Sequence, residues 1–96
     1  MLTTRELILQ LRLIKEDLAA KYSISRFALF GSFARGEQTE TSDIDLWVEF
    51  EGRIGSRFIE LADELEDRLG VKVDLVSGKG VKPAYAHCIA PDLIDV

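Results

Sequence analysis

The residues of this sequence best suited to chemistry are aspartates, and two of them are separated by a single residue. Asp43 and Asp45 lie in the stretch SDIDLWVEF, where apolar residues alternate with polar ones. On a β-strand, residues two apart project from one face, with Cα atoms about 6.5–7 Å apart. Their carboxylates can converge on Mg²⁺, which binds oxygen ligands at about 2.0–2.1 Å. Alone, such a pair more often marks the solvated face of an amphipathic strand, so it predicts a metal site only together with other residues.

Asp74 is the third candidate, in the middle of the apolar stretch VKVDLV. A bare carboxylate is costly to bury there, so we expect it to have a polar or ionic partner. If its strand neighbours that of Asp43 and Asp45, Asp74 can face the pair; the alternatives are pairing with Lys72 or simple solvation. Three carboxylates suit a site with two divalent cations about 3.5–4 Å apart, which stabilises the attacking and leaving oxygens of a phosphoryl-group displacement.

A Gly31-Ser32 pair follows an apolar segment and predicts a tight turn. Backbone N–H groups at such a turn attract phosphate oxygens, and the serine hydroxyl adds a donor. Arg35 is close enough in sequence to grip a phosphate through its forked guanidinium, or it can pair at the surface with Glu37 or Glu40. A Gly-Ser pair by itself is usually an ordinary turn.

The elements that must position these residues follow from periodicity and from residues that stop helices. Apolar residues at helical spacing predict helices over 4–22 and 56–69, the second ended by Gly70. Short apolar or alternating segments predict strands. The expected strands are 26–30, 43–50 and 71–76, and the strand 43–50 is expected to be half-buried. A short helical turn and a loop are expected over 33–42, and a last helix over 83–89. This order predicts an α/β (α+β) fold, a small mixed sheet of three or more strands with helices packed on it.

Length and composition indicate one domain, 1–96, since 96 residues leave no room for a second. The net charge is −5, so no basic face is expected and direct nucleic-acid binding is not predicted; an acidic protein can still hold a triphosphate through metal ions.

No apolar run reaches the roughly 20 residues that span a bilayer, and MLTTRELILQ does not resemble a signal peptide. The single Cys88, expected to be a small core residue, cannot form an internal disulfide. We expect a cytoplasmic protein.

The combined motif resembles that of a known superfamily. Gly31-Ser32, ten residues, then Asp43-Ile44-Asp45 is similar to the signature of the DNA polymerase β-like nucleotidyltransferases. The text GSFARGEQTETSDIDLWVEF, residues 31–50, resembles the MNT (minimal nucleotidyltransferase) family closely, and VKVDLVS, residues 71–77, resembles its third-aspartate strand. The tail KPAYAHCIAPDLIDV has the family's character too, so the resemblance covers nearly the whole chain.

The resemblance implies both an activity and roles for the residues. MNT proteins are prokaryotic antitoxins of HEPN-domain ribonuclease toxins, which implies transfer of AMP from ATP to a tyrosine hydroxyl of the toxin and a hetero-oligomer with it. Carried over, Gly31 and Ser32 would hold the triphosphate. Asp43 and Asp45 would ligate two Mg²⁺ ions, and Asp74 would complete the catalytic metal and help deprotonate the attacking hydroxyl.

Two other functions fit the same residues. The chain could be a binding module that neutralises a toxin by masking its surface, with catalysis lost or incidental. It could also transfer a nucleotide to a small molecule such as an antibiotic, which would require a second wall for the substrate, supplied by a dimer. Trp47 could stack on a base, although an aromatic residue there more often packs against the sheet or beneath a helix.

Overall fold

The computed structural model describes residues 2–96 of the chain. The long elements are helix α1 (Thr4–Tyr22), strand β1 (Ile24–Phe30), strand β2 (Ile44–Phe50), helix α3 (Arg57–Leu69) and strand β3 (Val73–Ser77). The short ones are α2 (Gly31–Arg35), the 3₁₀ turns η1 (Gly78–Gly80) and η2 (Ala90–Asp92), α4 (Pro83–Ile89) and β4 (Ile94–Asp95). No helix in this described range has the length and apolar character needed to cross a membrane.

The strands form one mixed sheet in the order β3-β2-β1-β4. β1 runs antiparallel to both β2 and β4, whereas β2 and β3 run parallel, joined by the crossover helix α3. A parallel pair needs such a crossover because its two strands begin at the same end of the sheet. The predicted α/β fold with a small mixed sheet is confirmed.

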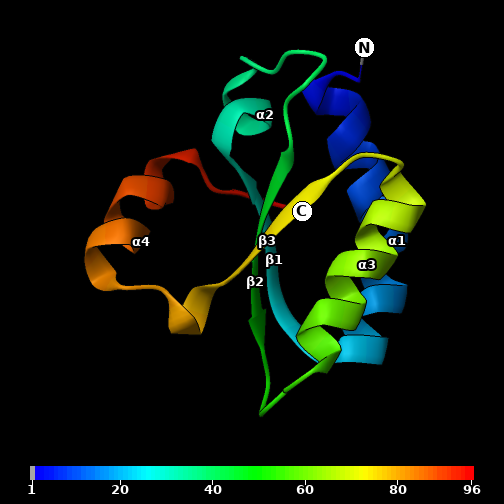
Figure 1. Ribbon diagram of the computed structural model, residues 1–96, viewed down its shortest axis with the longest axis vertical. Helices are drawn as coiled ribbons and strands as arrows, with labels where there is room; N and C mark the ends of the chain where they lie inside the picture. Colours follow the sequence, from blue (N-terminus) through cyan, green and yellow to red (C-terminus); the bar gives the residue numbers. More distant parts are fainter. Residues whose placement is uncertain (1) are drawn as a thin grey trace.

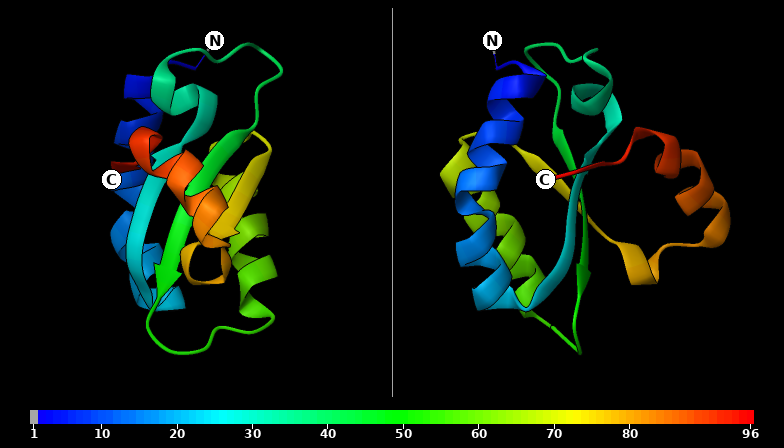
Figure 2. Two further views of the ribbon diagram at one scale, coloured as in Figure 1. Left: turned by 90° about the vertical axis from the view of Figure 1, so that its left-hand side faces the viewer. Right: turned by 180° about the vertical axis from the view of Figure 1, so that it is seen from behind.

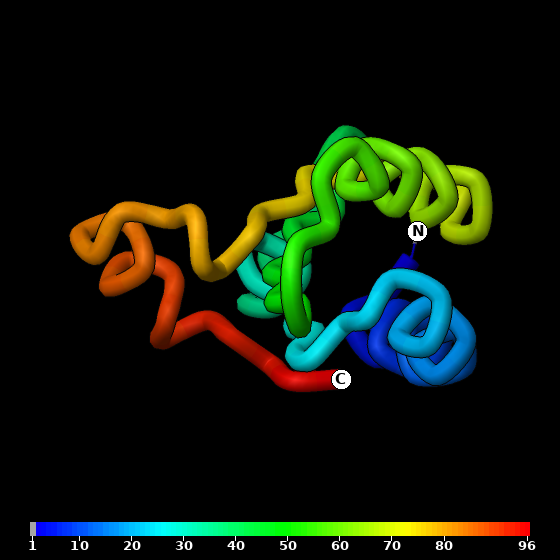
Figure 3. The backbone as a smooth tube through the Cα atoms, turned by 90° about the horizontal axis from the view of Figure 1, so that it is seen from below, coloured from blue at the N-terminus to red at the C-terminus, as the bar shows by residue number. Residues whose placement is uncertain are grey.

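Helices cover both faces of this sheet (Figure 1). α1 and α3 lie side by side on one face, and α4 lies across the other, as the two turned views show (Figure 2). Seen from below, the chain loops out through α4 and returns to the sheet beside β1 (Figure 3). The main core lies between the sheet and α1 and α3, and a smaller apolar cluster lies beneath α4.

The main core explains why these segments become helices on this face. α1 buries Leu7, Leu11 and Leu18, and α3 buries Leu61 and Leu65, all fully enclosed. Burying one such side chain contributes roughly 1.5–3 kcal/mol. Because these leucines recur at helical spacing, they form one apolar stripe on each helix, and that stripe packs against the sheet.

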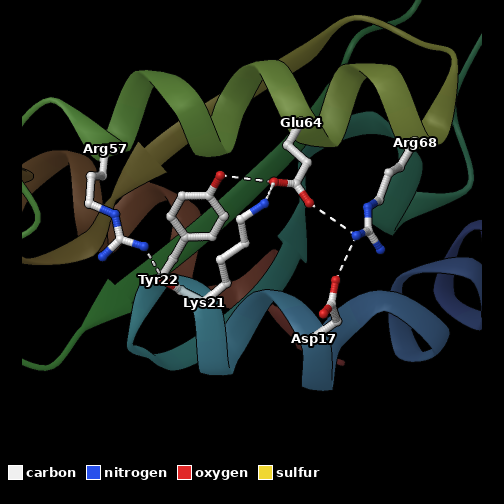
Figure 4. Close-up of polar contacts among 6 residues, drawn as sticks. All are labelled: Asp17, Lys21, Tyr22, Arg57, Glu64 and Arg68. Atoms are coloured by element: carbon white, nitrogen blue, oxygen red, sulfur yellow. Dashed lines mark hydrogen bonds and ion pairs between the residues drawn. The ribbon is translucent and has the colours of Figure 1, made fainter.

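A polar network on the outer side of this layer fastens α1 to α3 (Figure 4). Glu64 of α3 accepts hydrogen bonds from Lys21 at 2.7 Å and from the Tyr22 hydroxyl at 2.9 Å. Arg68 lies 3.0 Å from the other Glu64 oxygen and donates to Asp17 of α1 at 2.6 Å. The Tyr22 side chain is thereby buried while its hydroxyl keeps an acceptor.

Thr3 and Glu6 form a capping box at the start of α1. The Glu6 backbone N–H donates to Thr3 Oγ1 at 3.1 Å, and the Thr3 N–H donates to Glu6 Oε1 at 3.1 Å. Two N–H groups that α1 itself leaves unbonded are thus satisfied locally.

Apart from element boundaries, the structure differs from the sequence analysis at three points. β2 is not half-buried: Leu46, Trp47 and Val48 are all buried, because α4 covers the face that alternation alone assigns to solvent. Cys88 is exposed, because the short helix α4 turns only its Ile89 side inward. The terminal strand β4 was not predicted, since two residues are too few to show a period.

Candidate active site

Asp45 and Asp74 are direct partners in the parallel register of β2 and β3. Registered residues on neighbouring strands project from the same face. That face is the one covered by α4, because Trp47 and Val76, each two residues further along its strand, pack together in the cluster beneath α4. Asp74 was expected to face the aspartate pair, and the structure places it beside Asp45 of that pair.

Asp43 lies one residue before β2 and is exposed. The backbone beside it is fixed, since the Ile44 N–H donates to the Lys72 carbonyl at 2.9 Å and joins the starts of β2 and β3. Asp43 is near enough to Asp45 to influence its ionisation. The three predicted aspartates thus gather at one end of the parallel strand pair.

Gly31 gives the Asp45 carboxylate its space. Gly31 has φ +76°, in the left-handed region that residues other than glycine rarely adopt. A Cβ atom built there would lie 2.1 Å from Asp45 Oδ2. Glycine is therefore required both by the turn between β1 and α2 and by the carboxylate that lies against it, which places the Gly31-Ser32 turn directly beside the aspartates.

The ionisation of Asp45 reflects this crowding. Partial burial raises the pKa of Asp45 to about 6, from an ordinary value of 3.8, and the charges of Asp74 and Asp43 act in the same direction. The Arg35 guanidinium opposes the rise in this pKa without cancelling it. A carboxylate cluster that lacks enough positive charge of its own is suited to bind cations.

The donor set fits Mg²⁺ in chemistry, since it consists of carboxylate oxygens, the ligands that hard divalent cations prefer. The absence of a Cβ at Gly31 lets the Asp45 carboxylate lie against the turn, where it can act as one of these ligands. Within residues 2–96, no three His, Cys, Asp or Glu side chains already lie at the mutual spacing of a metal cluster. Because Asp43 and Asp74 are both exposed, their side chains can rotate about χ1 toward a cation near Asp45.

Arg35, at the end of α2, is held by carboxylates. Its Nε donates to Glu37 Oε1 at 2.9 Å, and its Nη1 donates to Asp92 Oδ2 of η2 at 2.6 Å. Of the two alternatives for Arg35, the surface pairing is the one observed here, with Glu37 and not with Glu40, and the pairing with Asp92 was not anticipated. Arg35 still influences the pKa of Asp45, so it belongs to the surroundings of the site.

Trp47 and Glu49 follow Asp45 on the same face of β2. The indole Nε1 donates to Glu49 Oε2 at 2.9 Å, and the ring packs tightly against Gly78, where a Cβ atom would lie 2.5 Å from it. Trp47 is 6% exposed. It is therefore a packing residue beneath α4 here, as the commoner role of such an aromatic suggests.

Two contacts around α2 lay beyond the reach of sequence patterns. Thr4 of α1 donates from Oγ1 to the Phe33 carbonyl of α2 at 2.5 Å, and Gln38 donates from Nε2 to the Leu2 carbonyl at 3.2 Å. They join residues 29 and 36 positions apart in the chain. No local spacing could indicate them.

Comparison with known proteins was consistent across sequence and structure. The model of a family described as "Nucleotidyltransferase domain" matches residues 11–95. The chain is 48% identical over 90 residues to MJ1379 of Methanocaldococcus jannaschii, assigned as a protein adenylyltransferase, with 90% of each chain covered. It is 38% identical over 98 residues to the protein adenylyltransferase MntA of Thermococcus cleftensis, covering 100% of this chain and 98% of that one.

Solved structures agree with these relatives. A minimal nucleotidyltransferase, 35% identical, superposes with a TM-score of 0.84 over 99% of this chain and 97% of its own. A toxin–antitoxin structure with AMP-PNP contains a chain 25% identical, with a TM-score of 0.71, covering 98% of this chain and 72% of that one.

Proposed function

Because the chain belongs to the nucleotidyltransferase domain family, we propose that it is a Mg²⁺-dependent antitoxin that transfers AMP from ATP to a tyrosine hydroxyl of a HEPN ribonuclease toxin. The observation that carries the proposal is the register of Asp45 beside Asp74, with the Gly31 turn against them. The names of the relatives support a protein substrate. A toxin–antitoxin neighbour with a bound ATP analogue supports both the partner and the nucleotide.

In this proposal the residues divide into those that hold the nucleotide and those that hold the metal ions. Gly31 and Ser32 hold the triphosphate through backbone N–H groups and the serine hydroxyl, and Arg35 adds a guanidinium at its edge. Asp43, Asp45 and Asp74 hold two Mg²⁺ ions, which supply charge stabilisation for the attacking and leaving oxygens.

The transfer itself is an in-line displacement. The tyrosine oxygen forms a bond to the α-phosphorus, and the bond from that phosphorus to the pyrophosphate oxygen breaks. Asp74 is exposed, so it can face an incoming hydroxyl and accept its proton. AMP remains on the tyrosine, and pyrophosphate leaves.

The openness of the site explains why a protein partner is part of the proposal. Asp43 and Asp74 are both exposed, so this chain alone does not exclude water from the acceptor side. A toxin surface that presents its tyrosine would close that side and form a hetero-oligomer with this chain. A reaction of this kind uses ATP inside a prokaryotic cell, in the cytoplasm.

The test is label transfer. The chain, Mg²⁺ and ATP labelled at the α-phosphate are incubated with the HEPN-domain protein encoded beside it, and we expect labelled tyrosine on that partner. The double variant Asp43→Ala plus Asp45→Ala should transfer no label. Glu51→Gln, which removes a charge from an exposed position just after β2, should transfer label normally. Absence of label with the unaltered chain would refute the proposal.

A cellular assay separates catalysis from masking. The double variant should fail to rescue cells that express the toxin if AMP transfer is what silences it. Full rescue by that variant would instead establish the chain as a binding module.

A further inference from the structure

The helix that carries the Gly31-Ser32 turn is very short. α2 contains only five residues, and its N-cap residue Phe30 makes no side-chain cap bond. At the other end backbone bonds close the last turn: Gly36 donates to the Phe33 and Ser32 carbonyls, and Glu37 donates to the Ser32 carbonyl at 2.9 Å. A helix of five residues is still only marginally stable by itself, so contacts from other elements also help to position it.

The start of α1 supplies such contacts. The Thr4 hydroxyl donates to the same Phe33 carbonyl at 2.5 Å, in a partly buried position. Further along the loop, the Gln38 amide donates to the Leu2 carbonyl at 3.2 Å. α1 is itself fixed by the core and by its network with α3. Thr4 therefore joins a rigid helix to the short segment that follows Ser32.

We infer that Thr4 is a positioning residue for nucleotide binding: its bond to Phe33 holds α2 so that the Gly31-Ser32 turn faces the triphosphate. The inference rests on the proposed function, in which that turn holds the phosphates. Thr4 contacts neither nucleotide nor metal in this scheme. Its effect reaches the ligand through one residue, because Phe33 directly follows Ser32.

The neighbouring Thr3 provides a matched control. Thr3 caps α1 through the Glu6 N–H and makes no contact with α2 among its hydrogen bonds. Removal of either hydroxyl deletes one hydrogen bond at the same end of the same helix. The two substitutions should therefore cost comparable stability, while only one of them releases the active-site helix.

The experiment compares Thr4→Val, Thr4→Ser and Thr3→Val with the unaltered chain. Binding is measured with Mg²⁺ and an ATP analogue that has a methylene group between the α- and β-phosphorus atoms, so that no transfer occurs. We expect Thr4→Val to weaken binding about three- to tenfold, the range that one lost hydrogen bond produces. The KM for ATP should rise in parallel while kcat stays within about twofold, because the reacting groups are intact.

The other variants show whether the effect belongs to this hydroxyl. Thr4→Ser keeps the donor and should bind as the unaltered chain does. Thr3→Val should lower the melting temperature as much as Thr4→Val and leave binding unchanged. Unchanged binding by Thr4→Val, or equal loss in Thr3→Val, would overturn the inference.

One further variant keeps this result distinct from the proposed function. If Ser32→Ala weakens binding and Thr4→Val does not, only the role of Thr4 is refuted. If Ser32→Ala binds the analogue normally, the proposed role of the turn is refuted as well.

Discussion

Asp74 lies directly beside Asp45 on the neighbouring parallel strand, so two carboxylates that repel one another occupy adjacent positions on one face of the sheet. Asp43 adds a third negative charge nearby, and Arg35 offsets the sum only in part. In the absence of a cation this end of the sheet is destabilising. The repulsion between these carboxylates therefore lowers the stability of the fold, and substitutions can measure that cost.

Asp45→Asn should stabilise the metal-free protein at pH 8 while abolishing AMP transfer. The pKa of Asp45 in the folded protein is about 6, above its ordinary value of 3.8, so the folded state is the more protonated one between these values, and above pH 6 it must hold a charged carboxylate at a cost. The charged form is thus unfavourable above pH 6. We expect a gain of about 1 kcal/mol by urea unfolding, reduced from the full pKa difference because the side chain is only partly buried.

The pH dependence gives the control for this prediction. The contribution of Asp45 to stability is fully present below pH 3.8 and is lost as pH rises through about 6. The difference between Asp45→Asn and the unaltered chain should therefore vanish in acid and grow toward neutral pH. A difference independent of pH would contradict this assignment of the pKa.

Gly31→Ala should abolish activity and destabilise the fold by about 1–3 kcal/mol, since the residue has positive φ and its Cβ would clash with the Asp45 carboxylate. Gly36→Ala is the matched control, because Gly36 has φ +69° but open space around its Cβ position. It should cost about 1 kcal/mol and retain transfer when assayed below its melting temperature. Equal activities for the two variants would contradict the close approach of Gly31 to Asp45.

The sequence was informative where a feature is local and periodic. The bounds of α1 and α4 agree with the predicted ranges, because an amphipathic stripe, a capping box and a proline mark them. The start of β3 was placed two residues early, since Val71 is apolar but precedes the first bond of the strand ladder. The position of Asp74 beside Asp45 required the strand order, which the sequence left conditional.

Features that depend on distant residues lay outside any pattern. Asp92 reaches Arg35 across 57 positions, and Thr4 reaches Phe33 across 29. The strand 43–50 was predicted to be half-buried because its residues alternate, yet α4 returns over its second face and buries Trp47 there. Tertiary packing decided these contacts, and periodicity carries no information about it.

Arg35→Ala should raise the KM for ATP about tenfold, as expected for loss of one charge-assisted contact to phosphate. Asp92→Asn should lower this KM, because Asp92 now competes with phosphate for the Arg35 guanidinium at 2.6 Å. Steady-state kinetics with varied ATP will check both. Glu40→Gln removes a carboxylate from the same loop without touching Arg35 and serves as the control. An increased KM in Asp92→Asn would mean that Asp92 orients Arg35 toward the nucleotide.

Glu64→Ala should reduce stability by about 1–3 kcal/mol and leave the KM for ATP unchanged. The substitution removes the acceptor of the buried Tyr22 hydroxyl, together with one partner each of Lys21 and Arg68 (Figure 4). These contacts lie on the α1–α3 side of the sheet, opposite the face that carries Asp45 and Asp74. Urea unfolding and steady-state kinetics at 25 °C measure the two effects separately.

Measuring the free energy of unfolding at acidic pH isolates the ionic part of the stability lost in Glu64→Ala. Hydrogen bonds from Lys21 and then from Tyr22 hold the pKa of Glu64 below its ordinary value of 4.5. Its ionic contribution is therefore present above pH 4.5 and is lost as pH falls through the lower folded value. The stability gap between Glu64→Ala and the unaltered chain should narrow in acid. Asp63→Ala, at the adjacent exposed position of α3, serves as the control and should be as stable as the unaltered chain at every pH. If Asp63→Ala lost as much stability as Glu64→Ala, the loss would come from the removal of a negative charge from the helix and not from the network.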